Sequence, residues 1–339
     1  MDERTLVDTA KKMVAPGRGI LAADESTGTI KKRFDSISVE STEENRRAYR
    51  DLLFTTPGAE EYISGAILFE ETLYQNTSDG TPFAKLLADR DIVPGIKVDK
   101  GAKPLAGAEG ETVTEGLDGL RERLAEYHEA GARFAKWRAV ITIGEGLPTN
   151  YAIATNAHAL ARYAALCQEA GIVPIVEPEV LMDADNTIEV CEAVTRDVLN
   201  ATFAELAKQR VLLEGMVLKP NMVISGKQCA VQADVETVAN ATLRTLKRCV
   251  PSAVPGIAFL SGGQSDELAT KHLDAMNKQG SAPWSLTFSY GRALQAAALK
   301  AWGGNSANTE VAQKAFFHRA KLNGLAATGR YSEAMEEAA

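Results

Sequence analysis

Cysteine and histidine are scarce in this sequence, and their spacing excludes two kinds of site. The 339 residues include four of each. The cysteines show no C-x-x-C spacing, which argues against a disulfide framework and against a zinc cluster. The histidines are scattered, and none is paired at zinc-ligand spacing. The two sets are Cys167, Cys191, Cys229 and Cys249, and His128, His158, His272 and His318. We therefore expect no bound metal.

Long apolar runs and excess positive charge are also absent. No stretch approaches the ~18 uncharged apolar residues that a membrane span needs. A net charge of −8 at pH 7 provides no overall attraction to nucleic acid. The charged start, residues 1–4, has no apolar signal region behind it. We expect a cytoplasmic protein with neither membrane nor nucleic acid among its partners.

The sequence does contain eight short apolar segments that end in polar residues. They recur every ~30 to 43 residues, which is the room that a strand, a loop and a covering helix need. Continuous apolar runs, rather than alternating ones, are typical of strands in a parallel sheet covered on both faces. The segments span residues 19–24, 63–70, 92–97, 132–138, 172–177, 215–219, 256–261 and 284–289.

Helix-like stretches lie between these segments, at residues 42–53, 117–130, 155–169 and 235–250. Eight strands with eight crossovers fit a (β/α)8 barrel, a fold of about 250 residues that accepts insertions beyond about 300. A composition of 45% hydrophobic residues is enough to bury a large core. We predict the α/β class, with one enlarged (β/α)8 TIM barrel over residues 1–339 and a flexible Glu- and Ala-rich end at residues 332–339.

Lys219 is the most informative single residue. It closes an apolar segment and precedes Pro220, which has no N–H to continue a strand. Burial disfavours the charged form of a lysine, and a neutral amine attacks carbonyl carbons. A lone lysine in such a place more often keeps its head in water, with its stem on apolar surface. The functional interpretation therefore depends on which residues end the other strands.

Ionisable residues end most of the other segments, and in a barrel these ends meet at one mouth. Residues two apart on a strand share a face, so Lys136 with Arg138, and Glu177 with Glu179, can point inward together. Lys97 ends a further segment and can hold an anion together with Arg138. Many ionisable groups at one mouth favour a functional site over chance surface charge.

Their chemistry suits a carbonyl substrate. Lys136 beside Lys219 raises the cost of two adjacent ammonium ions, which favours one neutral amine. Glu177 can shuttle protons as a carbinolamine forms and dehydrates, and Asp24 can accept a proton from a substrate hydroxyl. A purely structural ion pair between Lys136 and Glu177 stays open as the alternative.

Glycine-containing turns follow the seventh and eighth segments. Barrels commonly bind phosphate there through loop amides. The two turns are Ser261-Gly262-Gly263-Gln264 and Ser289-Tyr290-Gly291-Arg292. Arg292 adds a fork of donors that matches phosphate oxygens. The sequence therefore predicts a phosphate site at this side of the mouth.

These motifs resemble class I fructose-bisphosphate aldolase, in order, from about Leu6 to Tyr331. The most specific are Val176-Glu177-Pro178-Glu179 and Leu218-Lys219-Pro220-Asn221-Met222. The resemblance implies a lyase that reversibly cleaves fructose 1,6-bisphosphate to dihydroxyacetone phosphate and glyceraldehyde 3-phosphate in glycolysis and gluconeogenesis. It also implies an enzyme without metal or cofactor that is usually a homotetramer.

The resemblance further implies residue roles. Lys219 would form the Schiff base, Glu177 would be the principal acid and base, and Asp24 would be the base for carbon–carbon cleavage. Lys136 and Glu179 would support Lys219. The phosphate at the ketose end would bind to Ser261, Gly262, Ser289, Gly291 and Arg292, and the other phosphate to Lys97, Arg138, Ser26 and Thr29.

One departure from the family concerns the last proton transfer. Animal and plant relatives end in a tail whose terminal tyrosine is thought to protonate the enamine, and Tyr331 aligns before that tail. Water, Glu177 or Tyr331 would then supply the proton.

Two alternative functions stay open. Another Schiff-base barrel, such as deoxyribose-phosphate aldolase or transaldolase, would keep the lysine, but the second anion site around Lys97 and Arg138 argues against a monophosphate substrate. A scaffold or cytoskeleton-binding role is disfavoured by the intact catalytic set.

Overall fold

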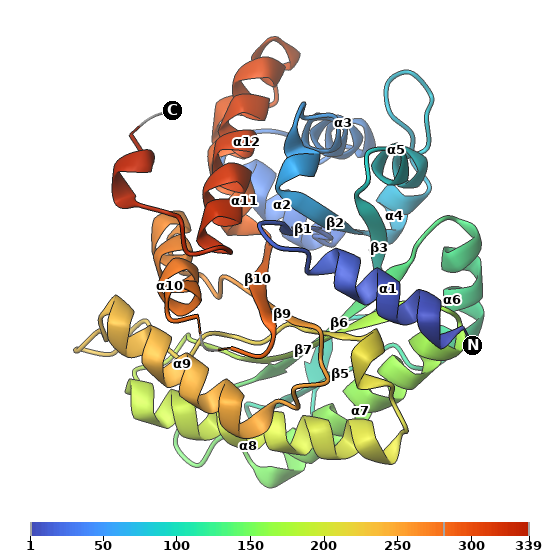
Figure 1. Ribbon diagram of the computed structural model, residues 1–339. Helices are drawn as coiled ribbons and strands as arrows, with labels where there is room; N and C mark the ends of the chain where they lie inside the picture. Colours follow the sequence, from blue (N-terminus) through green and yellow to red (C-terminus); the bar gives the residue numbers. More distant parts are fainter. Residues whose placement is uncertain (1, 281, 338–339) are drawn as a thin grey trace.

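A closed barrel of eight parallel strands forms the centre of the computed structural model, which describes residues 2–280 and 282–337 (Figure 1). Neighbouring strands follow the order β1-β10-β9-β8-β7-β6-β3-β2. They are β1 (Gly19–Ala23), β2 (Ile63–Leu68), β3 (Val93–Lys97), β6 (Phe134–Ile141), β7 (Val173–Val180), β8 (Val217–Leu218), β9 (Gly256–Phe259) and β10 (Ser285–Tyr290). Each overlaps one predicted segment, so the predicted (β/α)8 barrel is confirmed.

Helices surround the barrel. They are α1 (Glu3–Met13), α2 (Thr27–Asp35), α3 (Glu43–Phe54), α4 (Glu70–Leu73), α5 (Phe83–Asp89), α6 (Leu120–Glu129), α7 (Asn150–Glu169), α8 (Ile188–Lys208), α9 (Val235–Cys249), α10 (Asp266–Lys278), α11 (Arg292–Trp302) and α12 (Thr309–Ala326). The four predicted helices correspond to α3, α6, α7 and α9. Side-chain caps start three of them: Thr42 accepts a hydrogen bond from the Asn45 N–H at 3.1 Å, Thr149 accepts one from the Ala152 N–H at 3.2 Å, and Asp234 accepts one from the Thr237 N–H at 2.8 Å.

Helix α1 closes one end of the barrel, as Figure 1 shows. Leu6, Ala10 and Met13 are buried on its inner face and join the cluster of side chains that fills the barrel. That cluster also contains Phe134, whose ring needs the bare backbone of Gly95, because a Cβ there would lie 2.2 Å from the ring. With this end filled, the opposite end, where the strands finish, is left for a site.

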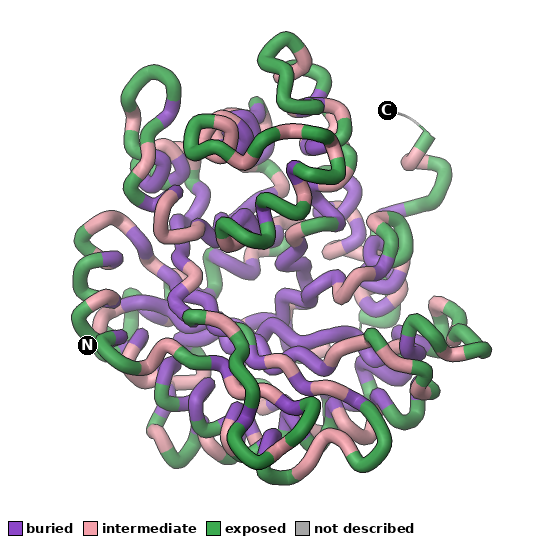
Figure 2. Tube along the Cα trace, turned by 180° about the vertical axis from the view of Figure 1, so that it is seen from behind, coloured by how far each residue is buried: buried purple, intermediate pink, exposed green. Residues whose placement is uncertain are grey.

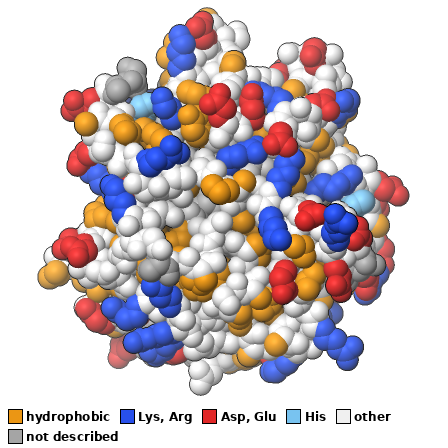
Figure 3. All heavy atoms as spheres, in the orientation of Figure 1, with side chains coloured by type: hydrophobic (Ala, Val, Ile, Leu, Met, Phe, Trp, Pro, Cys, Tyr) orange, Lys and Arg blue, Asp and Glu red, His pale blue; other side chains and the backbone are white. Residues whose placement is uncertain are grey.

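The burial pattern agrees with this arrangement. Figure 2 shows buried chain through the centre and exposed chain around the periphery. Figure 3 shows basic and acidic side chains interspersed on the face that carries α1. Within the described ranges no helix combines the length and the apolar character needed to cross a membrane.

Two features of the sheets were not predicted. A two-stranded antiparallel sheet, β4 (Ala102–Pro104) with β5 (Thr112–Thr114), projects between β3 and α6. Strands β6 and β7 also pair further than expected, with Arg138 opposite Glu177 and pairing that continues to Ile141 and Val180. Arg138 and Glu177 therefore lie within strands, because each strand is held by its neighbour beyond the apolar run.

The end of the chain is anchored where it is described. Residues Glu333–Met335 form a 3₁₀ turn, and Glu336 pairs with Arg319 of α12 and accepts a hydrogen bond from the Tyr331 hydroxyl at 2.9 Å. We predicted a flexible end over residues 332–339, and these contacts connect Glu336 to α12 and Tyr331. Residues 338–339 of that prediction lie outside the described residues.

Candidate active site

A cavity of about 580 Å3 opens at the carboxyl end of the barrel strands. This volume is within the usual range for small-molecule sites. Every site residue predicted from the sequence lines it: Asp24, Ser26, Thr29, Lys97, Lys136, Arg138, Glu177, Glu179, Lys219, Ser261, Gly262, Ser289, Gly291 and Arg292. The structure thus brings the predicted residues together at one cavity.

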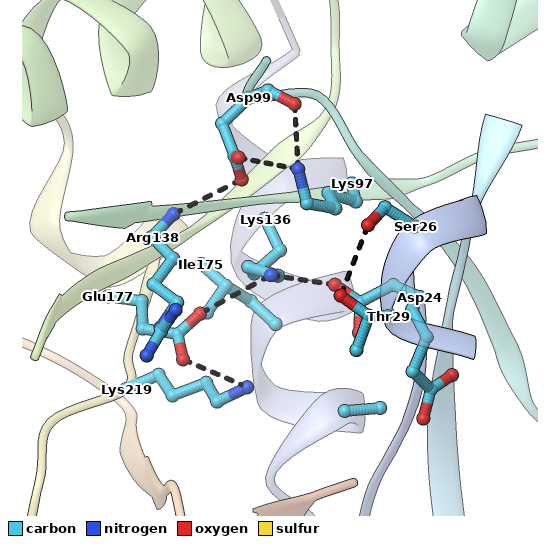
Figure 4. Close-up of polar contacts among 12 residues, drawn as sticks. Asp24, Ser26, Thr29, Lys97, Asp99, Lys136, Arg138, Ile175, Glu177 and Lys219 are labelled. Carbon is cyan, nitrogen blue, oxygen red and sulfur yellow. Dashed lines mark hydrogen bonds and ion pairs between the residues drawn. The ribbon is translucent and has the colours of Figure 1, made fainter. Parts of the chain in front are cut away.

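Lys136 lies at the centre of the cavity floor (Figure 4). Its Nζ is 2.6 Å from Asp24 Oδ2 and 3.6 Å from Glu177 Oε2. Burial lowers the pKa of Lys136, but the charges of Asp24 and Glu177 outweigh it and hold that pKa above its usual value. These pairs therefore favour the ammonium form of Lys136 at neutral pH.

Asp24 is the counterpart of this lysine. Burial raises the pKa of Asp24, but the charges of Lys136 and Lys219 outweigh burial and lower it to about 2. The carboxylate is thus ionised at neutral pH, and in the ligand-free site it is committed to Lys136.

Lys219 directly follows β8, where its backbone N–H still bonds to Val176 at 2.8 Å. Its side chain is buried, and Nζ lies 3.2 Å from Glu177 Oε1. The other oxygen of Glu177 accepts no hydrogen bond among the described residues. Glu177 thus lies between two lysines and keeps a free lone pair for a proton (Figure 4).

The charged pairs at the Lys97 side differ from expectation. Glu179, which the sequence assigned to Lys219, pairs directly with Arg138. Lys97 pairs with Asp99, a residue that sequence reasoning missed, and donates to the Asp99 carbonyl at 2.7 Å. The sequence analysis selected ionisable residues at the ends of predicted strands, which we call the strand-end criterion. Asp99 lies two residues past the end of β3, so this criterion did not identify it.

Two hydroxyl groups complete that side of the cavity. Ser26 precedes α2, and its Oγ lies 3.2 Å from Thr29 Oγ1. Both residues face the charged groups in Figure 4.

The opposite side of the cavity has donors suited to an anion. Ser289 is 1% exposed, and its Oγ has no hydrogen-bond partner among the described residues. Gly291 is the N-cap of α11, so the first N–H groups of that helix are directed to this side. Gly262 and Gly263 have φ of 56° and 76°, values that favour glycine and form the neighbouring turn.

Helix α2 supplies further lining residues that the sequence undervalued. Lys31 and Lys32 are both exposed, but Lys31 pairs with Asp35 at 2.8 Å, whereas Lys32 lines the cavity. Four cavity residues on α2 or beside it share helical spacing: Thr29, Lys32, Arg33 and Ser36. That spacing of three and four residues was a signal in the sequence.

A buried carboxylate holds the side chain of Arg33 in place. Its guanidinium pairs with Glu25, which also pairs with Arg50 at 2.7 Å. A Cβ on Gly291 would lie 3.5 Å from Arg33 Nη2. Arg33 therefore lies beside the Gly291 turn, not with Lys97.

Tyr331 is not in a position to deliver a proton. It is 4% exposed, does not line the cavity, and gives its hydroxyl hydrogen to Glu336. Its consideration as a rim donor was wrong, because the chain after α12 carries it against α10, where its N–H bonds to Asp274 at 3.0 Å.

No group of three or more His, Cys, Asp or Glu side chains with metal-binding geometry occurs in the described part of the chain. The cavity is instead lined by lysines, arginines and carboxylates, and the shortest contacts already described join amines to carboxylates.

Comparisons with known proteins agree with the geometry. The sequence model of the class-I fructose-bisphosphate aldolase family matches residues 5–339. A probable class 1 fructose-bisphosphate aldolase of Xanthomonas campestris is 61% identical, covering 98% of this chain and 99% of that protein. Cytosolic fructose-bisphosphate aldolase 4 of Arabidopsis thaliana is 58% identical, covering 96% and 83%. A solved Plasmodium falciparum fructose-bisphosphate aldolase, in complex with TRAP and a small-molecule inhibitor, superposes with a TM-score of 0.96 at 53% identity, covering 97% of this chain and 95% of that one.

Proposed function

The chain belongs to the class I fructose-bisphosphate aldolase family and is a lyase that cleaves fructose 1,6-bisphosphate reversibly, and we propose that Lys219 carries the reaction as a Schiff base. The observation that supports this assignment most is the unequal pairing of the two buried lysines. Lys136 has carboxylates at 2.6 and 3.6 Å, whereas Lys219 pairs with Glu177 at 3.2 Å. Lys219 is therefore the amine less tightly held by carboxylates, and so the one freer to contact a substrate carbonyl.

Imine formation needs two proton transfers that Glu177 can serve. The Lys219 amine adds to the substrate ketone and forms a carbinolamine, which must lose one proton from nitrogen and gain one on the departing hydroxyl. Glu177 Oε1 is within hydrogen-bond reach of Lys219 Nζ, and Glu177 Oε2 is buried and accepts no hydrogen bond among the described residues, so it has acceptor capacity left for a proton. The ammonium of Lys136 stabilises negative charge on the oxygen during this step.

Cleavage needs a base at the hydroxyl next to the breaking bond. As that proton leaves, the bond breaks and its electron pair moves to the protonated imine, which becomes an enamine. We assign the proton to Asp24. Since Lys136 lowers the proton affinity of Asp24, their 2.6 Å contact must loosen when substrate binds. Protonation of the enamine then falls to Glu177 or water.

We propose that the two sides of the cavity hold the two phosphates. The Ser261–Gly262 turn, Ser289 and the Gly291–Arg292 helix start would take the ketose-end phosphate, supported by the unpartnered Ser289 hydroxyl. Lys97, Arg138, Ser26 and Thr29 would take the other phosphate, once the Lys97 and Arg138 side chains turn from their acidic partners.

Replacing each lysine by arginine tests the assignment. Lys219→Arg keeps a positive charge but cannot form an imine, so we expect loss of all cleavage. Lys136→Arg keeps an ammonium-like partner for Asp24 and should retain measurable turnover. Loss in the second variant alone would contradict the proposal.

We also propose a cellular location and an assembly for the enzyme. Arabidopsis relatives named cytosolic support a cytoplasmic location and a role in glycolysis and gluconeogenesis. Family resemblance supports a homotetramer of four 36.3-kDa chains. Light scattering of the purified protein would measure this mass directly.

A further inference from the structure

We propose that Lys227 is an additional binding residue for the phosphate at the ketose end of the substrate. The inference rests on the proposed placement of that phosphate at the Gly262–Gly263 and Gly291–Arg292 turns. Lys227 lies between α9 and β8 in sequence, eight residues past the proposed Schiff-base lysine, and follows no barrel strand directly. The strand-end criterion therefore did not identify it.

The backbone of Lys227 is fixed at the cavity rim. Its N–H bonds to the Met182 carbonyl at 2.8 Å, and the N–H groups on either side bond to the carbonyls of Asn186 and Ala184 at 2.9 and 3.0 Å. Packing between these two loops is tight, because a Cβ on Gly226 would lie 2.1 Å from the Ala184 carbonyl oxygen. The side chain of Lys227 thus extends from a place where backbone hydrogen bonds hold the loops after β7 and β8 together.

The side chain of Lys227 points to the same place as Arg292. A Cβ on Gly263 would lie 2.9 Å from Lys227 Nζ and 2.7 Å from Arg292 Nη2. Gly263 therefore has an ammonium and a guanidinium group against it, and its φ of 76° already favours glycine. These two cations repel each other. A phosphate dianion bound between them would attract both and outweigh that repulsion.

Asp183 holds Lys227 while no phosphate is bound. Its Oδ1 lies 2.6 Å from Lys227 Nζ, and both side chains are partly exposed, at 62% and 41%. Ion pairs this exposed are weak, so a phosphate can displace Asp183 from the lysine. Asp183 thus competes with the phosphate for Lys227.

The test measures KM for fructose 1-phosphate and the inhibition constant of inorganic phosphate against that substrate. Lys227→Met should raise both about fivefold to tenfold, with kcat within twofold, because a charge-assisted contact is lost in ground and transition states alike. Lys227→Arg should recover most of the loss, and Asp183→Asn should lower both constants by removing the competitor. A purely structural Lys227 would not give opposite signs for Lys227→Met and Asp183→Asn.

Two further variants separate the possible failures. Lys85→Met is the matched control, because Lys85 also forms a 2.6 Å pair with an aspartate, Asp89, and does not line the cavity. If Arg292→Ala raises KM but Lys227→Met behaves like Lys85→Met, the inference about Lys227 is wrong and the phosphate site stands. If Arg292→Ala also leaves KM unchanged, the proposed phosphate site itself is wrong. A KM increase with fructose 1,6-bisphosphate alone would move Lys227 to the other phosphate and overturn the inference.

Discussion

Replacing Lys136 by methionine would remove the cation that keeps Asp24 ionised inside the barrel. Methionine keeps much of the length of the side chain and its apolar stem, so packing changes little. The pKa of Asp24 lies at about 2, against an ordinary 3.8. At about 1.36 kcal/mol per pKa unit, this difference is worth about 2 kcal/mol of folding stability at neutral pH. Glu177 loses a partner as well, so we expect a total loss of about 3 kcal/mol.

The loss of folding stability should depend on pH, and the ion pair between Asp24 and Lys136 determines the direction of that dependence. In the parent protein the Asp24 contribution is complete above pH 3.8 and disappears as the pH falls through about 2. In the variant, the pKa of Asp24 rises because burial is no longer offset by the charge of Lys136, so lowering the pH neutralises the buried carboxylate and removes part of the destabilisation. The stability difference between the two proteins should therefore be large at pH 7 and smaller at pH 4.

Urea unfolding at pH 7, 5 and 4 would measure this difference, with Lys85→Met as the control for loss of an exposed pair of the same 2.6 Å length. A Lys136→Met loss no greater than that of the control would refute the account of the buried charges. So would a loss that is equal at pH 7 and pH 4.

Three further predictions concern the reaction and the chain end. Exhaustive EDTA treatment should leave cleavage unchanged, because the proposed route uses an amine; loss of activity that zinc restores would contradict it. Asp24→Asn should lower kcat at least about hundredfold while borohydride still traps an adduct on Lys219, because the defect follows imine formation; an absent adduct would mean an earlier or structural role. Deletion of residues 332–339 should leave cleavage nearly unchanged and lower the thermal midpoint by about 2–4 °C, because the buried Arg319 loses its contact with the Glu336 carboxylate. A selective drop in proton exchange at the dihydroxyacetone phosphate carbon would show instead that this end delivers the proton.

Strong local patterns made most of the barrel predictable. Eight apolar runs give eight strands because strands covered on both faces leave no polar alternation. The β4–β5 sheet escaped because Ala102–Pro104 is exposed and has no apolar pattern. The extension of β6 and β7 past Arg138 was not predicted, because it depends on pairing with the neighbouring strand. The sequence of a single segment does not show this pairing.

The site was predictable where one strand places one residue, and not where loops meet. Lys219, Lys136 and Glu177 each lie on a barrel strand or end one, so the fold alone directs them to the mouth. Their pairing was not predictable, since it depends on side-chain distances. Lys227 was not predicted as a site residue, because contacts between two loops determine its position. The contact of Glu336 was not predicted either, because its partner, Arg319, lies on another element.

Borohydride trapping tests the central claim most directly. The native enzyme is incubated with fructose 1,6-bisphosphate, reduced with sodium borohydride, digested and mapped by mass spectrometry. Because Lys136 is held as an ammonium ion by Asp24 and Glu177, we predict one reduced adduct, on Lys219, in step with loss of activity. An adduct on Lys136 with Lys219 unmodified, or inactivation with no adduct on either lysine, would contradict the account.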